Sequence, residues 1–223
     1  MKLPFDKVYM LHLAENENRL NFMVEQFKHH GISKQVEIWW TCKRDISVEI
    51  GNNLNSLHTD AYDWYKGNEK TKGVYGGVFN FAFEHYTIIK QAYLRGFESI
   101  LIIEDDCEFI KDKKLFKDIF DNIPEDYDII KYHNGVFYEN DNDDNIINKY
   151  YNRCNFAKGN TTCYALKRRG MELVINQYNK CFEPSDIVLD KAMDYNSCKE
   201  VNSYAVNKLV NYVEGFISNI YYH

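Results

Sequence analysis

The chain of 223 residues has no long apolar run and no excess of basic residues. No stretch approaches the roughly 20 apolar residues that span a bilayer. Residues 1–7 contain Pro4 and charged side chains where a signal peptide would need an apolar run. We therefore expect a cytoplasmic protein without a transmembrane segment, for which peripheral contact with a membrane stays open. The net charge of -6 argues against nucleic acid as a main partner.

The six cysteines include no C-x-x-C pair, which argues against a zinc site and against a thiol redox motif. They lie at the widely spaced positions 42, 107, 154, 163, 181 and 198. Such a pattern is typical of a reduced intracellular protein rather than of one held together by disulfides. The chemistry of the chain is therefore sought in its other side chains.

A run of four aliphatic residues, Ile100 to Ile103, predicts a short strand buried on both faces, as in the middle of a parallel sheet. Glu104, Asp105 and Asp106 follow at its carboxyl end, where open α/β sheets keep their ligand crevice. In an extended chain, Glu104 and Asp106 would point to one side and Asp105 to the other. Two such carboxylates suit a hard cation, Mg²⁺ or Mn²⁺. A solvated acidic turn explains an isolated acidic triplet about equally well.

The amino-terminal part of the chain has the pattern of a β-α-β unit. A strand is expected over residues 8–13, a helix over residues 15–30 that ends at Gly31, and a second strand over residues 36–40. Such a unit is typical of a nucleotide-binding half-sheet. His12 ends the first strand, and Arg19 in the helix suits a phosphate or an acidic wall. A surface pair between Arg19 and Glu15 is an equally good explanation for the arginine.

Apolar periodicity predicts the elements of the remaining chain. Helices are expected over residues 76–95, 112–122 and 168–178 and from Pro184 onward, and strands over residues 128–132, 161–166, 203–206 and 209–213. Loops are expected over residues 41–75, with a short helix near 60–65, and over residues 139–148. His85 lies on the apolar face of its helix, which favours a core histidine over a catalytic one. The order of elements predicts an α/β fold with a single Rossmann-like central sheet flanked by helices.

The order of these motifs resembles that of glycosyltransferase family 25, which includes lipopolysaccharide biosynthesis enzymes and collagen galactosyltransferases. The similarity extends from Tyr9 to Ile220. It is carried by His12-Leu13 with Arg19, Gly76-Gly77 with Glu84-His85, Glu104-Asp105-Asp106, residues 161–166, Pro184-Ser185-Asp186 and residues 215–220. The chain departs from the family pattern at His12, where the family usually has Asn, and at Glu84, where it usually has Ser.

The resemblance implies a GT-A type of α/β fold that forms one domain over residues 1–223. Its nucleotide-binding half would cover about residues 1–110 and its acceptor-side half about residues 111–223. The implied activity is inverting transfer of a sugar, galactose or glucose, from a UDP-sugar to a hydroxyl of a surface glycan or glycoprotein, with Mn²⁺ or Mg²⁺. The donor would be bound by His12, Leu13, Arg19, Glu84, His85, Glu104 and Asp105, and the metal by Glu104 and Asp106.

Inversion needs a carboxylate that takes the proton of the acceptor hydroxyl. Asp186 and Asp190 are spaced to share one face of a helix, and the resemblance places this helix on the acceptor side. Asp186 is the first candidate for the base and Asp190 the second. An acidic residue that only complements the helix dipole explains Asp186 equally well.

Two other functions stay open on the sequence. A sugar-phosphate nucleotidyltransferase would need a Gly-rich basic loop after the first strand, which residues 14–18 do not offer. The second alternative is a non-catalytic carbohydrate-binding or scaffold domain of the same fold.

Overall fold

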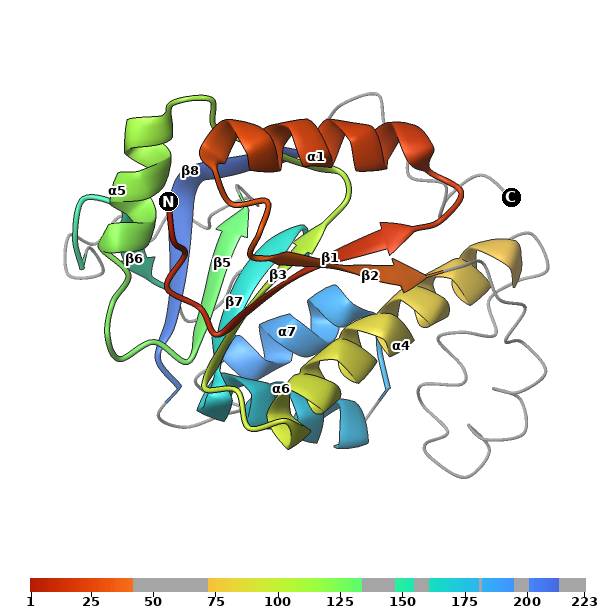
Figure 1. The fold of residues 1–223 in the computed structure, drawn as a ribbon. Coiled ribbons are helices and arrows are strands. Elements are labelled where there is room, and N and C mark those ends of the chain that lie inside the picture. Colours follow the sequence, from red (N-terminus) through yellow and green to blue (C-terminus); the bar gives the residue numbers. More distant parts are fainter. Residues whose placement is uncertain (42–71, 134–146, 155–160, 181, 195–200, 213–223) are drawn as a thin grey trace.

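The computed structural model describes residues 1–41, 72–133, 147–154, 161–180, 182–194 and 201–212. These residues form one mixed sheet with helices on both faces (Figure 1). Its strands are β1 (Lys7–Leu13), β2 (Val36–Thr41), β3 (Ser99–Glu104), β4 (Cys107–Phe109), β5 (Ile129–His133), β6 (Tyr151–Arg153), β7 (Cys163–Lys167) and β8 (Ser203–Tyr212). Its helices are α1 (Glu17–His30), α4 (Lys72–Leu94), α5 (Lys113–Asp121), α6 (Arg168–Lys180) and α7 (Ser185–Met193). The predicted α/β fold with one central sheet is confirmed.

The predicted β-α-β unit is present at the amino terminus. β1 pairs in parallel with β2 on one side and with β3 on the other. α1 ends at Gly31, whose left-handed backbone, with φ of 68°, lets its amide donate to the carbonyls of the last turn. Because β1, β2 and β3 run the same way, their carboxyl ends meet at one edge of the sheet.

The prediction that β3 lies within a parallel sheet is confirmed for one of its neighbours and wrong for the other. The strand is parallel to β1 but antiparallel to β7 on its other side, within the order β2-β1-β3-β7-β5-β8-β4. Ile100 and Ile103 are fully buried, as predicted. An aliphatic run reports burial on both faces of a strand but not the direction of its neighbours, which is why the sequence alone did not give this pairing.

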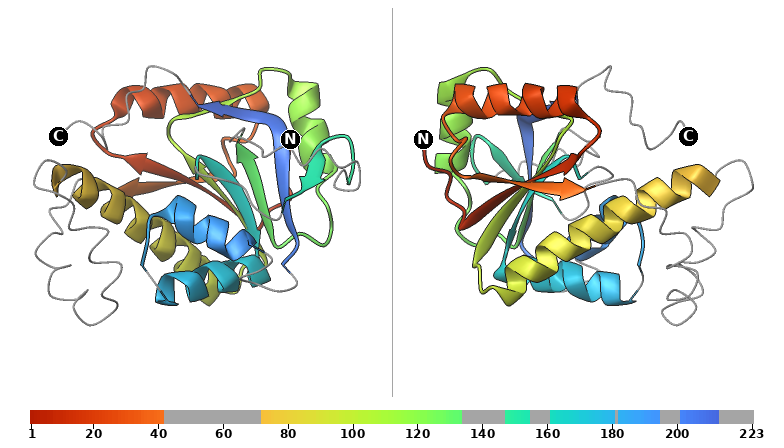
Figure 2. Two further views of the ribbon diagram at one scale, coloured as in Figure 1. Left: turned by 180° about the vertical axis from the view of Figure 1, so that it is seen from behind. Right: turned by 45° about the vertical axis from the view of Figure 1, so that its right-hand side comes forward.

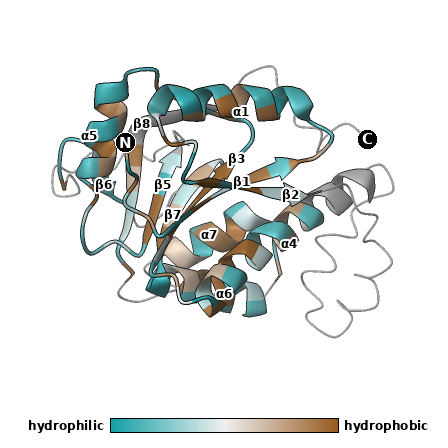
Figure 3. Cartoon of the chain, viewed as in Figure 1, coloured by the Kyte–Doolittle hydropathy of each residue, from teal (hydrophilic) through white to brown (hydrophobic). Residues whose placement is uncertain are grey.

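The helices form one layer on each side of the sheet (Figures 1 and 2). Alternate residues of β3 enter two separate cores. Leu101 and Ile103 pack in the core that contains α1 and α5, whereas Ile100 and Ile102 pack in the core that contains α4, α6 and α7. Figure 3 shows hydrophilic residues along the outer side of α1. Any side chain at the end of β3 is therefore directed to one layer or the other.

Close packing of α6 against β5 depends on Gly170. A Cβ atom at this position would lie 2.0 Å from the carbonyl oxygen of Asp128. Only a residue without a side chain allows this approach, which seats α6 against the sheet in the layer that it shares with α4 and α7.

Several element boundaries differ from those predicted. Residues 203–206 and 209–213 were expected as two strands, but β8 is continuous from Ser203 to Tyr212. It is paired with β5, β6 and β4, and a shift of register opposite Lys131 and His133 accommodates its length. The short strands β4 and β6 were not predicted, because three residues carry too little periodicity.

Other predictions lie wholly or partly outside the described residues. The loop with its short helix near 60–65, most of the loop over residues 139–148 and the closing loop over residues 215–220 belong to this group. The division into a nucleotide-binding half and an acceptor-side half stays a prediction. Among the helices of the described ranges, none combines the length and the apolar character that crossing a bilayer requires.

Candidate functional site

The acidic triplet lies at the carboxyl end of β3, as predicted, but it is not extended throughout. β3 ends at Glu104, and Asp105 and Asp106 form the turn that leads into β4. The side chains of Glu104 and Asp105 go to opposite layers of the molecule, whereas Asp106 lies in the turn. Their exposed fractions are 9%, 6% and 8%. Such burial excludes a solvated acidic turn, and three adjacent buried carboxylates require compensation from their surroundings.

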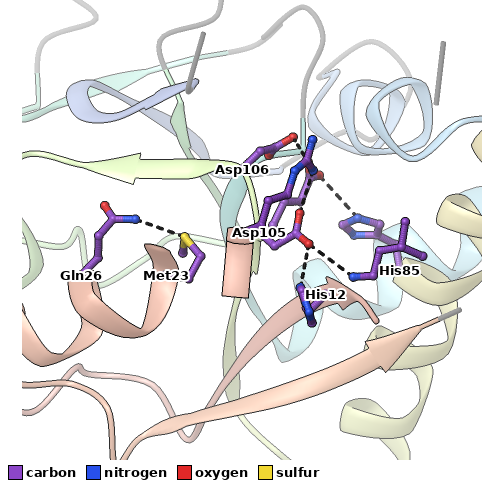
Figure 4. A network of polar contacts seen from close by, with 9 residues as sticks. His12, Met23, Gln26, His85, Asp105 and Asp106 are labelled. Atoms are coloured by element: carbon purple, nitrogen blue, oxygen red, sulfur yellow. Dashed lines mark hydrogen bonds and ion pairs between the residues drawn. The ribbon is translucent and has the colours of Figure 1, made fainter. Parts of the chain in front are cut away.

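Asp105 is compensated by groups from β1 and α1. Its Oδ2 accepts a hydrogen bond of 2.8 Å from Nδ1 of His12 and one of 3.3 Å from the amide of Leu13. Its Oδ1 accepts a bond of 2.9 Å from Nη1 of Arg19. Figure 4 shows His12 and Asp105 pointing toward each other, with Asp106 beside them. Both oxygens of Asp105 are thus engaged by residues that the sequence predicted for this site.

Arg19 also connects Asp105 to the next carboxylate. Its Nη1 lies 3.5 Å from Oδ2 of Asp106, and its side chain is 11% exposed. An arginine this deeply buried is not the surface residue that a pair with Glu15 would require. The guanidinium group therefore belongs to the acidic wall, one of the two roles predicted for it.

Gln26 of α1 fixes the chain just after the turn. Its Nε2 donates to the carbonyl of Cys107 over 2.8 Å, and its Oε1 accepts a bond of 2.7 Å from the amide of Phe109. These two bonds satisfy the backbone of β4 and hold it against α1. Sequence reasoning missed Gln26, because nothing marks a single glutamine in a helix as the partner of a strand 81 residues away.

Glu104 lies in the other layer, beside His85 of α4. Nε2 of His85 is 3.5 Å from Oε1 of Glu104, and Nδ1 of the same ring is 2.7 Å from the hydroxyl of Tyr164. His85 is fully buried and stacks on Tyr164 with ring centroids 5.7 Å apart. The histidine is therefore a core residue, as its helix face predicted, and it also borders the acidic motif.

Two carboxylate oxygens of the acidic triplet have no hydrogen-bond partner in the described part of the chain. Oε1 of Glu104 and Oδ1 of Asp106 are buried without a hydrogen-bond partner among the described residues. Nε2 of His12 and Nε2 of His85 are also buried without a hydrogen-bond partner in this part of the chain. Buried polar atoms are nearly always satisfied in proteins. A hydrogen-bond donor or a cation bound at this strand end would satisfy the two carboxylate oxygens.

Burial shifts the pKa of each of these carboxyl groups upward. It raises the pKa of Glu104 to about 8, with the charges of Asp105 and Asp186 adding to the effect and a hydrogen bond from Thr161 opposing it. It raises the pKa of Asp106 to about 7, with the charge of Glu104 as the next cause. Burial also lowers the pKa of His85 to about 3, so this ring is neutral. The raised pKa values of Glu104 and Asp106 favour their protonated forms near neutral pH.

The donor atoms of Glu104 and Asp106 fit a hard divalent cation, because Mg²⁺ and Mn²⁺ prefer carboxylate oxygens. No group of three or more His, Cys, Asp or Glu side chains suited to a metal ion occurs within the residues described. An ion at this site would therefore need water or a bound phosphate for its remaining positions. Mg²⁺ is commonly held in this way, by one or two carboxylates and the phosphates of a substrate.

Glu84 has a structural contact at the border of the site. It is 4% exposed, and its Oε2 accepts a hydrogen bond of 2.8 Å from Nε1 of Trp39. This bond ties α4 to β2 and gives a reason for a glutamate where the resemblance leads one to expect serine. Its predicted role in donor binding stays a prediction.

The two candidate bases on α7 have different surroundings. The charge of Asp186 raises the pKa of both Glu104 and His85, so this carboxylate acts electrostatically on both groups. It is partly exposed, and its Oδ1 accepts a bond of 3.0 Å from the amide of Ile187. Asp190 instead forms an ion pair with the buried Lys131. The environment of Asp186 is therefore the better suited to accepting a proton from a ligand.

Comparison with known proteins leaves the function open. No family model and no curated protein matches the chain. Among solved structures, it is similar to mouse xyloside xylosyltransferase 1 in its apo form, with 9% sequence identity, a TM-score of 0.40, and coverage of 90% of this chain and 84% of the other. A TM-score this low supports no functional assignment, and membership of family 25 stays a prediction.

The raised pKa values predict how stability depends on pH. Because Glu104 and Asp106 have folded-state pKa values of about 8 and about 7, above their ordinary values of 4.5 and 3.8, the folded protein binds more protons than the unfolded chain. Their contribution to stability is full below the unfolded values and is lost as the pH rises through 7 to 8. In EDTA, Tm should therefore fall between about pH 5 and about pH 8.5, less steeply in Asp106→Asn than in the parent.

Differential scanning calorimetry with and without Mn²⁺ checks this dependence. The cation should raise Tm more at high pH than at low pH, because it competes with protons for the same oxygens. Identical pH slopes in the parent and in Asp106→Asn would show that Asp106 does not titrate in this range.

Proposed function

We propose that the chain is a metal-dependent inverting glycosyltransferase that uses a UDP-sugar, with galactose or glucose as the sugar, and a hydroxyl of a surface glycan or glycoprotein as acceptor. The observation that carries this proposal is the pair of unsatisfied buried oxygens on Glu104 and Asp106 at the carboxyl edge shared by β1 and β3. This edge is where α/β sheets bind nucleotides. The resemblance to family 25 supplies the class of reaction.

In this proposal Glu104 and Asp106 hold Mn²⁺ or Mg²⁺, which offsets the charge of the leaving diphosphate. Arg19 and His12 bind Asp105, and Arg19 also contacts Asp106, so contacts within the protein hold the turn that carries Asp106. Such preorganisation means that a bound donor does not have to reorder the site. His12 and Arg19 thus act by holding the acidic motif in place, a role compatible with the departure from Asn at position 12.

Asp186 acts as the general base on the acceptor side. Its carboxylate acts electrostatically on Glu104 and His85, and its exposure leaves it accessible to an acceptor hydroxyl. The hydroxyl proton moves to a carboxylate oxygen of Asp186 as the hydroxyl oxygen attacks the anomeric carbon, and the bond between that carbon and the diphosphate oxygen breaks to release UDP. Asp190 is a poorer base, because its negative charge is already neutralised by Lys131.

The reaction class is tested by metal-dependent hydrolysis of a panel of nucleotide sugars without acceptor. The parent should turn over UDP-galactose or UDP-glucose slowly with Mn²⁺ and not in EDTA. Asp106→Asn, which keeps the shape of the side chain and removes a charge, should lose this turnover and bind UDP with Mn²⁺ at least about 10-fold more weakly by calorimetry. The matched control Asp121→Asn removes an exposed carboxylate from α5 and should behave like the parent.

Two results would count against the assignment. Unchanged Mn²⁺-dependent UDP affinity in Asp106→Asn would remove this residue from the metal site. Binding of sugars without turnover of any donor would favour the alternative, a non-catalytic carbohydrate-binding or scaffold domain.

The base is tested by Asp186→Ala. Loss of a general base typically costs about 10² to 10⁴ in rate, and binding on the donor side does not involve this carboxylate. We expect transfer at least about 100-fold slower than in the parent, with UDP and Mn²⁺ bound equally well. Single-turnover kinetics with labelled donor measure the rate, and calorimetry measures the binding. An Asp186→Ala variant that transfers sugar at the parental rate would place the base elsewhere.

A further inference from the structure

Lys131 of β5 is a buried lysine that sequence reasoning did not assign to the site. It is 3% exposed, and its Nζ forms an ion pair with Oδ1 of Asp190 on α7. Its neighbours Ile130 and Tyr132 pack in the core of the α1 layer. Strand alternation therefore directs Lys131 to the layer of α4, α6 and α7, where Asp190 lies (Figure 1).

Lys131 is also next to the wall of the candidate site. It is paired in register with Tyr164 of β7, whose hydroxyl is 2.7 Å from Nδ1 of His85. Residues opposite each other on paired strands lie on the same face of a sheet. Only β7 thus lies between β5, which carries Lys131, and β3, which carries Glu104.

Burying the Lys131–Asp190 ion pair costs free energy. Two charges that leave water lose hydration energy, and apolar side chains of similar size often stabilise a protein as well or better. A charged pair does fix geometry, because its attraction is directed between two particular atoms, whereas apolar contacts tolerate sliding. Asp190 lies one turn after Asp186 on the same face of a helix of nine residues. Anchoring Asp190 therefore sets the position of Asp186.

We propose that Lys131 is a positioning residue that, by binding Asp190, fixes α7 and with it the carboxylate of Asp186. This inference rests on the proposed function, in which Asp186 is the base. It assigns Asp190 to the support of the base rather than to proton transfer. At the far end of α7, the hydroxyl of Ser203 on β8 lies 3.3 Å from the carbonyl of Met193 and closer to the carbonyl of Cys154, to which it donates.

Lys131→Met tests the anchor by two independent readouts. Hydrogen exchange of the α7 amides should be faster than in the parent, because the first turns of the helix lose their tie to the sheet. The kcat for sugar transfer should fall roughly 10- to 100-fold, as small misplacements of catalytic groups do, while the KM for the UDP-sugar stays within about twofold. The matched control Lys191→Met removes an ion pair with Glu183 from the same helix at an exposed lysine. It should change neither readout.

The double variant Lys131→Met/Asp190→Leu separates positioning from stability and replaces the single variant if that one fails to fold. Removing both charges should return Tm toward the parental value. We expect kcat to stay low in the double variant, because the directed contact is still missing. Parental kcat together with restored Tm would show that the pair serves only the fold and would overturn the inference.

The remaining outcomes are also decisive. Parental exchange of α7 in Lys131→Met overturns the inference whatever the activity, as does faster exchange with unchanged kcat. If the parent transfers no sugar from any donor, the proposed function fails, and the exchange of α7 still decides whether Lys131 anchors the helix.

Discussion

The site depends on how three adjacent buried carboxylates are compensated at the end of β3. Asp105 is fully paired, with His12, Leu13 and Arg19 donating to its two oxygens. Glu104 and Asp106 each retain an unsatisfied buried oxygen, and burial raises the pKa of both. One carboxylate thus organises the site while the other two are left to bind a ligand. In the proposed function, a divalent cation would satisfy both oxygens and replace the protons that they would otherwise hold.

The fold creates this asymmetry through the alternation of β3. Residues of the strand enter the two helical layers in turn, so Glu104 reaches His85 on α4 and Asp105 reaches Arg19 on α1. The turn at Asp106 then brings the chain back toward Arg19. Because α7 belongs to the same layer as α4, the proposed base lies on the Glu104 side of the motif. The proposed metal ligands are thus contacted by side chains of α1 and α4, whereas the proposed base is carried by α7.

Local patterns were enough to predict much of the architecture. The aliphatic run at Ile100, the β-α-β unit with its stop at Gly31 and the place of the acids at a strand end follow from neighbours in sequence. The antiparallel partner β7, the clamp by Gln26 and the ion pair of Lys131 do not, because each joins residues that are far apart along the chain. His85 shows the limit clearly: its helix face predicted burial, but only the fold reveals Glu104 and Tyr164 as its partners.

The central claim is that Glu104 and Asp106 hold a divalent cation against a nucleoside diphosphate. Anomalous diffraction from crystals grown with UDP and Mn²⁺ tests it most directly, because the signal identifies the ion and its ligands together. The account predicts a manganese peak about 2.2 Å from carboxylate oxygens of both residues, with phosphate oxygens completing the coordination. A peak bound by other side chains, or UDP bound at this edge without any manganese, would contradict the account.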